Sequence, residues 1–349
     1  MDLNGRRTSG NIEDRRGQSS GGGNYGGFGT GSGGGGLNII QLILSLLMMR
    51  RSSNSGNKAS GTGGGGCGCL AIVIVLVLLF LVMGGGVSNC SGLLGGLGGM
   101  TSGSQYTDDD TELTTSSDDE SSSSINKGTD EDEELATFAS KILAGTEDIW
   151  TAQFQKMGKS YVAPKMVLYS NYISTGCGQG SASTGPFYCS ADQKVYLDLS
   201  FFKTMKQEIG ADGDFAYAYV IAHEVGHHVE YLTGILDKCH RQMAQYGTDS
   251  EKSNQISVRL ELLADFYAGC WAYHDNEQFH SLQEGDIDEA IDAALKIGDD
   301  YLQKKARGYT TPESFTHGTS KQRSKWFKLG LTTGDMSKGD TFSCKYEDL

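Results

Sequence analysis

The pentapeptide HEVGH, residues 223–227, contains residue types that can bind and use a metal ion. On a helix, residues four apart lie on one face about one turn apart, so His223 and His227 can reach a single ion. Glu224 lies beside them and can accept a proton from water. This H-E-x-x-H spacing is typical of zinc peptidases, although so short a pattern also arises by chance. The predicted helix, its apolar flanks and Gly226, which permits close approach of another element, favour a Zn²⁺ site.

Two histidines leave a Zn²⁺ ion short of protein ligands, so the sequence must supply another. In the metzincin pattern H-E-x-x-H-x-x-G-x-x-H, the glycine and last histidine positions hold Glu230 and Thr233, which excludes that class. In the gluzincin arrangement the third ligand is a glutamate from a later helix, and the segment ELLAD offers Glu261. Asp265 lies four residues on, so we predict that it accepts the second N–H of a ligating histidine. The alternative is an ordinary acidic helix face.

The elements that must position these residues are predicted between residues 131 and 349. A periodic apolar pattern after residue 131 predicts a first helix, broken near Gly145. Strands are followed by helices, which predicts an α+β fold with a small antiparallel sheet plus several helices, as in a zincin-like metallopeptidase domain. The predicted strands are 165–170, 185–189 and 194–199, and the later helices are 212–234, 253–274, 286–305 and 319–331.

The chain before residue 131 has a different composition. Most of the 50 glycines precede Met100, and residues 1–66 are predicted to form a glycine-rich disordered region with an interfacial helix at 37–49. Residues 67–87 are uncharged and apolar and reach the ~20 residues needed to cross a bilayer, which predicts one transmembrane helix. Residues 88–130 are predicted to be an acidic, Ser/Thr-rich linker.

The charge distribution predicts how this anchor is oriented. Basic residues exceed acidic ones before the span, and acidic residues follow it. The prediction is a single-pass protein of the bacterial cytoplasmic membrane, with its N-terminus in the cytoplasm, its catalytic domain outside and membrane lipid around the anchor. If residues 37–49 also crossed, the topology would invert. The net charge of −14 argues against a nucleic-acid partner.

The cysteines add one structural expectation. Cys177 and Cys189 flank a glycine-rich turn and are close enough to close a hairpin by a disulfide in an extracytoplasmic domain. No C-x-x-C pair occurs between residues 131 and 349, which argues against a zinc site made of thiolates.

Several segments in the same order resemble the neutral zinc metallopeptidase family of bacterial membrane-anchored proteins. The resemblance runs from about Glu131 to Cys344 and returns in GRRTSGNIEDRR, residues 5–16. It implies His223, His227 and Glu261 as Zn²⁺ ligands and Glu224 as the catalytic base of an enzyme that hydrolyses peptides or proteins. The segments that carry it are GADGDFAYAYVIAHEVGHHVEYLTGI, RLELLADFYAGCW, TGCGQGSASTGPFYCSADQKVYLDLSFF and SFTHGTSKQRSKWFKLG.

Two of these segments have a more specific interpretation. The hairpin before HEVGH is similar to the edge-strand hairpin of thermolysin-like enzymes, which implies that residues 185–188 pair with substrate; a purely structural hairpin is the alternative. HGTSKQR is similar to the H-P-x-x-x-x-R segment of other membrane metallopeptidases but lacks the proline. By that similarity His317 would stabilise an oxyanion and Arg323 would hold a ligand carboxylate or a substrate carbonyl. A capping or surface role for both remains the alternative.

The remaining histidines and tyrosines give weaker signals. His228 points about 100° away from His227 on a helix, which predicts a supporting or surface position. Tyr219 is predicted to lie in the core. The function predicted is zinc-dependent hydrolysis of peptide bonds, with oligomeric state undefined; the alternative is a zinc-stabilised, non-catalytic membrane scaffold or binding module, against which Glu224 argues.

Overall fold

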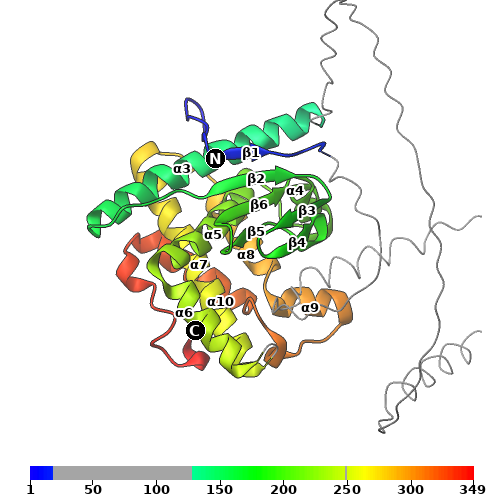
Figure 1. The fold of residues 1–349 in the computed structure, drawn as a ribbon, viewed down its shortest axis with the longest axis vertical. Helices are drawn as coiled ribbons and strands as arrows, with labels where there is room; N and C mark the ends of the chain where they lie inside the picture. The colour runs from blue at the N-terminus through cyan, green and yellow to red at the C-terminus, as the bar shows by residue number, and fades with distance from the viewer. Residues whose placement is uncertain (19–127, 248–249) are drawn as a thin grey trace, which may run out of the picture. The chain divides into compact units, whose positions relative to one another are not determined.

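The computed structural model describes residues 1–18, 128–247 and 250–349, which are mostly helical around a small sheet (Figure 1). The sheet order is β1-β2-β6-β5. β1 pairs with β2 and β2 with β6 in parallel, whereas β6 and β5 are antiparallel. The strands are β1 (Ile12–Asp14), β2 (Lys165–Tyr169), β5 (Phe187–Cys189) and β6 (Lys194–Asp198).

The prediction of an antiparallel sheet was therefore wrong, and the sheet is mixed. The expected hairpin exists between β5 and β6, where a short turn enforces antiparallel pairing. Between β2 and β6 the chain forms a separate antiparallel pair, β3 (Tyr172–Thr175) and β4 (Gly178–Ser181). This longer connection lets β6 return parallel to β2, which no pattern within either strand could indicate.

Side chains of the sheet alternate between two cores, as expected for the period of two in a strand. Met166 and Leu168 of β2 face the helices and join the main core. Val167 and Tyr169 face the other way, where the β3–β4 pair contributes Ile173 to a second, smaller cluster. Both faces of β2 are consequently buried.

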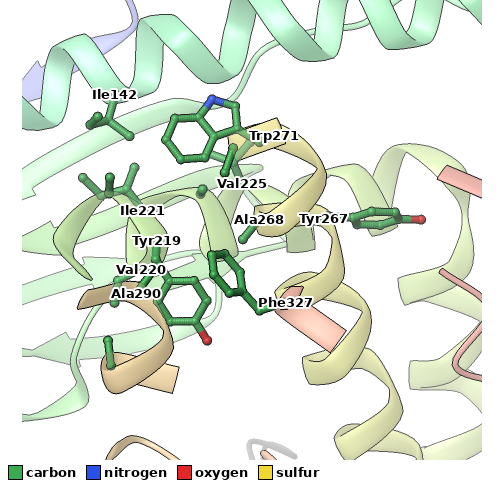
Figure 2. Packing of buried hydrophobic residues seen from close by; sticks show 14 of the residues in the cluster. Ile142, Tyr219, Val220, Ile221, Val225, Tyr267, Ala268, Trp271, Ala290 and Phe327 are labelled. Carbon is green, nitrogen blue, oxygen red and sulfur yellow. The ribbon is translucent and has the colours of Figure 1, made fainter. Parts of the chain in front are cut away.

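Helix α5 (Asp214–Thr233) lies in the main core, between the sheet and α7 (Glu251–Phe279). Figure 2 shows Ile221 and Val225 of α5 near Ile142 of α3 and Trp271 of α7, all of which are buried. The other helices are α3 (Asp130–Lys156), α4 (Ser200–Thr204), α6 (Ile235–Tyr246), α8 (Asp286–Lys296), α9 (Asp299–Arg307) and α10 (Ser320–Thr333), and a π turn spans Met205–Ile209.

Gly226 sets the distance between α5 and α7. A Cβ added at this position would lie 3.0 Å from the main-chain oxygen of Ala264. The close approach places the part of α7 that carries Glu261 and Asp265 beside HEVGH, so this glycine positions the candidate site.

Two helix predictions differ from the structure. The predicted helix 286–305 is divided into α8 and α9 at Gly298, where an added Cβ would lie 2.3 Å from the main-chain nitrogen of Ser320. The first helix is not broken at Gly145. This glycine instead leaves room for the guanidinium of Arg6, whose Nη2 would lie 2.7 Å from an added Cβ.

Residues 1–18 are part of the fold, so the prediction of a disordered region was wrong for them. β1 pairs with β2, and Arg6 forms a two-pronged ion pair with buried Asp275, with N–O distances of 3.2 and 2.7 Å. Arg16 is also buried and pairs with Asp14 and Glu133. The resemblance noted for residues 5–16 thus corresponds to a structural element of the domain.

This pairing also overturns the predicted single-pass topology. One crossing between residues 18 and 128 would place β1 and β2 on opposite sides of a membrane, which their hydrogen-bonded pairing excludes. Among residues 1–18, 128–247 and 250–349, no helix has the length and apolar character required to span a bilayer. The predicted span 67–87, the interfacial helix 37–49 and nearly all of the linker 88–130 lie outside the described residues. The predicted localisation as a single-pass membrane protein is therefore wrong.

Candidate active site

α5 and α7 bring His223, His227 and Glu261 together. The Nε2 atom of His223 lies 3.2 Å from one Glu261 oxygen, and the Nε2 atom of His227 lies 3.6 Å from the other. One potential ligand atom from each residue falls within 4.8 Å of the others. These three side chains can therefore hold one metal ion.

The spacing of these atoms fits zinc. Ligand atoms of a tetrahedral Zn²⁺ site, with bonds of roughly 2.0–2.2 Å, lie about 3.3–3.6 Å apart. The distances from Glu261 to His223 and His227 are close to that range. Both histidines present Nε2, because their Nδ1 atoms are occupied by other carboxylates. Two imidazoles and a carboxylate also leave a fourth position for water or substrate, as in catalytic zinc sites.

Asp265 contacts His223 at Nδ1, the ring nitrogen that does not face Glu261. Its Oδ1 lies 2.8 Å from His223 Nδ1 and accepts a hydrogen bond of 2.6 Å from the Tyr219 hydroxyl. Arg323 donates to both oxygens of the same carboxylate. Burial would raise the pKa of Asp265, but the charges of Arg323 and His223 outweigh it and lower the pKa to about 2. Asp265 therefore stays ionised and, in the neutral form of His223, keeps the proton on Nδ1 so that Nε2 is free to bind a metal.

Glu230 contacts the Nδ1 atom of His227 as Asp265 contacts that of His223, and it was not singled out from the sequence. Its Oε2 lies 2.9 Å from His227 Nδ1, and the residue is fully buried. The signal was available, since Glu230 follows His227 by three residues and i,i+3 side chains on a helix can touch. By sequence pattern alone, Glu230 only marks a departure from the metzincin motif.

Glu224 lies in the same cavity as the three candidate ligands. Burial raises the pKa of its carboxyl group above the ordinary value, while the neighbouring histidines and a main-chain hydrogen bond from Tyr188 lower it. A buried carboxylate with a raised pKa is a better proton acceptor than an exposed one, as general-base catalysis requires.

His317 and Arg323 also line this cavity, but their surroundings differ. Arg323 is buried against Asp265, so it does not lie at the surface, and its Nη1 also lies 3.5 Å from the main-chain oxygen of Ile297 at the end of α8. His317 is held by Asp299, whose Oδ2 accepts the main-chain N–H of His317 at 2.7 Å and whose Oδ1 lies 3.3 Å from Nδ1. With Nδ1 turned towards Asp299, the Nε2 edge of His317 is left for the cavity. Asp299, which begins α9, was not singled out from the sequence.

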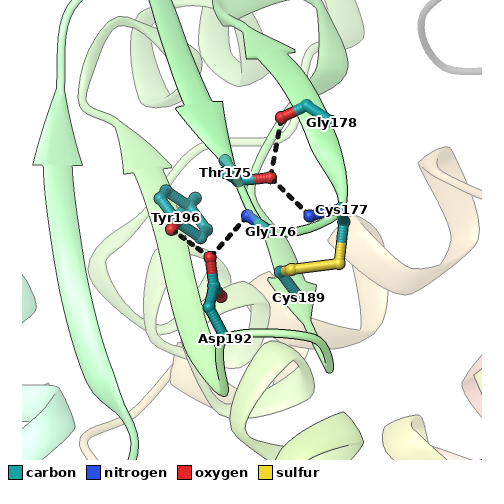
Figure 3. Close-up of a disulfide and its surroundings, with 7 residues drawn as sticks. All are labelled: Thr175, Gly176, Cys177, Gly178, Cys189, Asp192 and Tyr196. Carbon is teal, nitrogen blue, oxygen red and sulfur yellow. Dashed lines mark hydrogen bonds between the residues drawn. A yellow bond between two sulfur atoms is a disulfide. The ribbon is translucent and has the colours of Figure 1, made fainter.

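β5 is an outer strand of the described four-stranded sheet and borders the cavity, whose lining includes Gly185, Pro186, Phe187 and Tyr188. A disulfide joins its last residue, Cys189, to Cys177 in the turn between β3 and β4 (Figure 3). In the same turn the Gly176 main-chain N–H donates a 2.7 Å hydrogen bond to Asp192, which ties the turn to the β5–β6 hairpin. The disulfide and this hydrogen bond thus hold the C-terminal end of β5 against the β3–β4 turn.

The fold and the site together define a metallopeptidase-like centre, in which a helix bearing H-E-x-x-H meets a glutamate from a second helix. Comparison with known proteins agrees. Residues 46–342 match the family described as "Putative neutral zinc metallopeptidase", and the chain belongs to this family.

Curated relatives extend the comparison. The chain is similar to the "Uncharacterized protein YpfJ" of Escherichia coli strain K12, at 54% identity over 60% of this chain and 72% of the relative. It is also similar to the "Uncharacterized protein Rv2575" of Mycobacterium tuberculosis strain H37Rv, at 42% identity over 52% of this chain and 64% of that relative. No solved structure matches the chain.

Proposed function

We propose that this chain is a zinc-dependent peptidase that hydrolyses peptide bonds. The observation that carries the proposal is the convergence of His223, His227 and Glu261 at separations suited to tetrahedral Zn²⁺, with Glu224 in the same cavity. In this proposal the three residues are the metal ligands. A bound Zn²⁺ ion supplies a Lewis acid for the scissile carbonyl and the attacking water.

The protein's own groups perform the proton transfers and orient the substrate. Glu224 accepts a proton from the attacking water and delivers it to the leaving amine. His317 donates a hydrogen bond from Nε2 to the developing oxyanion when its imidazole is protonated. The carboxylate of Asp299, at the other ring nitrogen, favours this charged form.

Two features of the cavity support an extended peptide as substrate. β5 is an outer strand, so a peptide can add to it through main-chain hydrogen bonds. The cavity measures about 180 Å³, whereas a cavity of roughly 150 Å³ is known to admit benzene, so a bulky side chain fits. The apolar part of the cavity lining would favour an apolar side chain near the scissile bond; it includes Phe201, Ile209, Val220, Ile297 and Leu302.

The test compares the parent chain with Glu224→Gln for zinc content and for cleavage of a quenched fluorogenic peptide library. The parent chain should hold one Zn²⁺ per chain and cleave library members. Glu224→Gln should retain the zinc but lose activity by at least about 100-fold, the lower range for a general base. Glu284→Gln, an exposed change outside the cavity, is the matched control and should behave as the parent.

The outcomes distinguish a zinc peptidase from a zinc-stabilised binding module without catalytic activity. Equal cleavage by Glu224→Gln and the parent would refute the proposed mechanism. Stoichiometric zinc without cleavage of any peptide by the parent would favour a zinc-stabilised binding module instead.

A further inference from the structure

His228 follows the candidate ligand His227 but faces a different part of the protein. Its side chain is 1% exposed, so it does not lie at the surface. Both ring nitrogens are engaged: Nε2 lies 2.7 Å from the main-chain oxygen of Val162, and Nδ1 lies 2.9 Å from the hydroxyl of Tyr188. Protein groups therefore satisfy both polar atoms of this buried side chain.

These partners define the direction of both hydrogen bonds. A carbonyl oxygen can only accept, so Nε2 of His228 carries a proton and donates it to Val162. In a neutral imidazole Nδ1 is then an acceptor, and the hydroxyl of Tyr188 donates to it. His228 therefore connects α5 to the segment before β2 through Val162 and to β5 through Tyr188.

Tyr188 is the central residue of the outer strand β5 and lines the active-site cavity. Its ring lies against His228, with ring centroids 5.3 Å apart, and its main-chain N–H faces the carboxylate of Glu224. Any movement of Tyr188 along α5 would shift both the strand edge and the group that contacts the proposed general base.

We propose that His228 is a positioning residue that holds β5 in register with α5 through the hydroxyl of Tyr188. This hydrogen bond fixes the position of the Tyr188 main chain relative to Glu224. It also fixes the position of the β5 edge with which an extended peptide would pair. The kinetic part of the inference rests on the proposed peptidase function. The structural part, that this bond restrains β5, does not depend on that function.

The competing explanation is that His228 contributes only to core packing. Its ring also lies near the rings of Tyr161 and Tyr231, at centroid distances of 5.9 and 6.3 Å. Under that explanation a substitution lowers stability but leaves the dynamics of β5 and the kinetics of the folded enzyme unchanged.

The test uses Tyr188→Phe, His228→Gln and the double variant in the zinc-loaded full chain. Tyr188→Phe removes one hydroxyl and keeps the ring, and His228→Gln keeps an amide that can donate to Val162. Hydrogen exchange followed by mass spectrometry should show amides of residues 187–189 exchanging about 2- to 10-fold faster in each single variant, as expected for one lost hydrogen bond. The double variant should be no faster than the faster single variant, because both changes remove the same bond.

The kinetic measurement uses a fluorogenic peptide that the parent cleaves. Each single variant should raise KM and lower kcat, each by a factor of about 2 to 10, and the double variant should show no further loss. His274→Gln is the control, since His274 also lies 2.9 Å from a main-chain oxygen, that of Gly334, away from the cavity. It should leave exchange in β5 and both kinetic constants unchanged.

Unchanged exchange at 187–189 in both single variants, or additive effects in the double variant, would overturn the inference. If the parent cleaved no peptide, the proposed function would fail, while the exchange measurement would still decide whether His228 restrains β5.

Discussion

Arg323 and His223 are held by one carboxylate, that of Asp265. Arg323 donates to both Asp265 oxygens at 2.9 Å, and Oδ1 of the same group lies 2.8 Å from His223 Nδ1. All three side chains are buried. Asp265 thus has two tasks: it neutralises a buried guanidinium and it orients a candidate metal ligand.

Replacing Asp265 should therefore damage both stability and metal binding. Asp265→Asn leaves Arg323 buried without its counter-charge, which should lower the free energy of unfolding by about 3–5 kcal/mol. Zn²⁺ affinity should fall about 10- to 100-fold because His223 loses its partner. Urea unfolding of the metal-free chain and competition with a chromogenic chelator measure the two effects.

Glu230→Gln is the matched comparison for this prediction. It removes the corresponding partner of His227 and should reduce Zn²⁺ affinity by a similar factor. It leaves no arginine unpaired, so its effect on unfolding should be smaller. Equal destabilisation by the two variants would show that the Arg323–Asp265 pair does not have the assigned role.

Zn²⁺ affinity should increase with pH. Burial lowers the pKa of His223, but the carboxylates of Asp265 and Glu261 outweigh it and raise the pKa to about 9. Below that pH the ion must displace a proton, so the apparent Kd should fall about tenfold per pH unit for each proton released. Chelator competition at pH 6, 7 and 8 measures the slope. A Kd that does not change with pH would contradict the prediction.

The N-terminal segment should stabilise the domain through Arg6. Arg6→Ala leaves the carboxylate of Asp275 buried without its cation, and the free energy of unfolding should fall by about 3–5 kcal/mol. Arg7→Ala is the control, because Arg7 is 50% exposed and its ion pairs should contribute at most about 1 kcal/mol. Urea unfolding of both variants measures the two losses. Indistinguishable midpoints would show that the Arg6–Asp275 ion pair does not stabilise the domain.

The disulfide between Cys177 and Cys189 should stabilise the cavity border. It closes a short loop, so its loss should lower the free energy of unfolding by about 3 kcal/mol. Thermal unfolding of the parent with and without reductant tests this. The double variant Cys177→Ser/Cys189→Ser should unfold at the temperature of the reduced parent and should not respond to reductant. A parent that is insensitive to reductant would contradict the prediction.

Local regularities of the chain determined much of the candidate site. The helical repeat alone places His223 and His227 on one face, and the same repeat pairs Glu261 with Asp265. The apolar patterns located α5 and α7 to within a few residues, and the turn between β5 and β6 indicated their hairpin. Each of these inferences depends on neighbours close in sequence.

Only the tertiary structure showed the contacts between residues that lie far apart in the sequence. The close approach at Gly226 brings Glu261 to the histidines, and α9 supplies Asp299 to His317. The parallel pairing of β1 with β2 joins residues separated by most of the N-terminal half of the chain. The same pairing contradicts the predicted single-pass topology. No periodicity encodes such contacts, because they arise only when whole elements pack and bury their charged groups together.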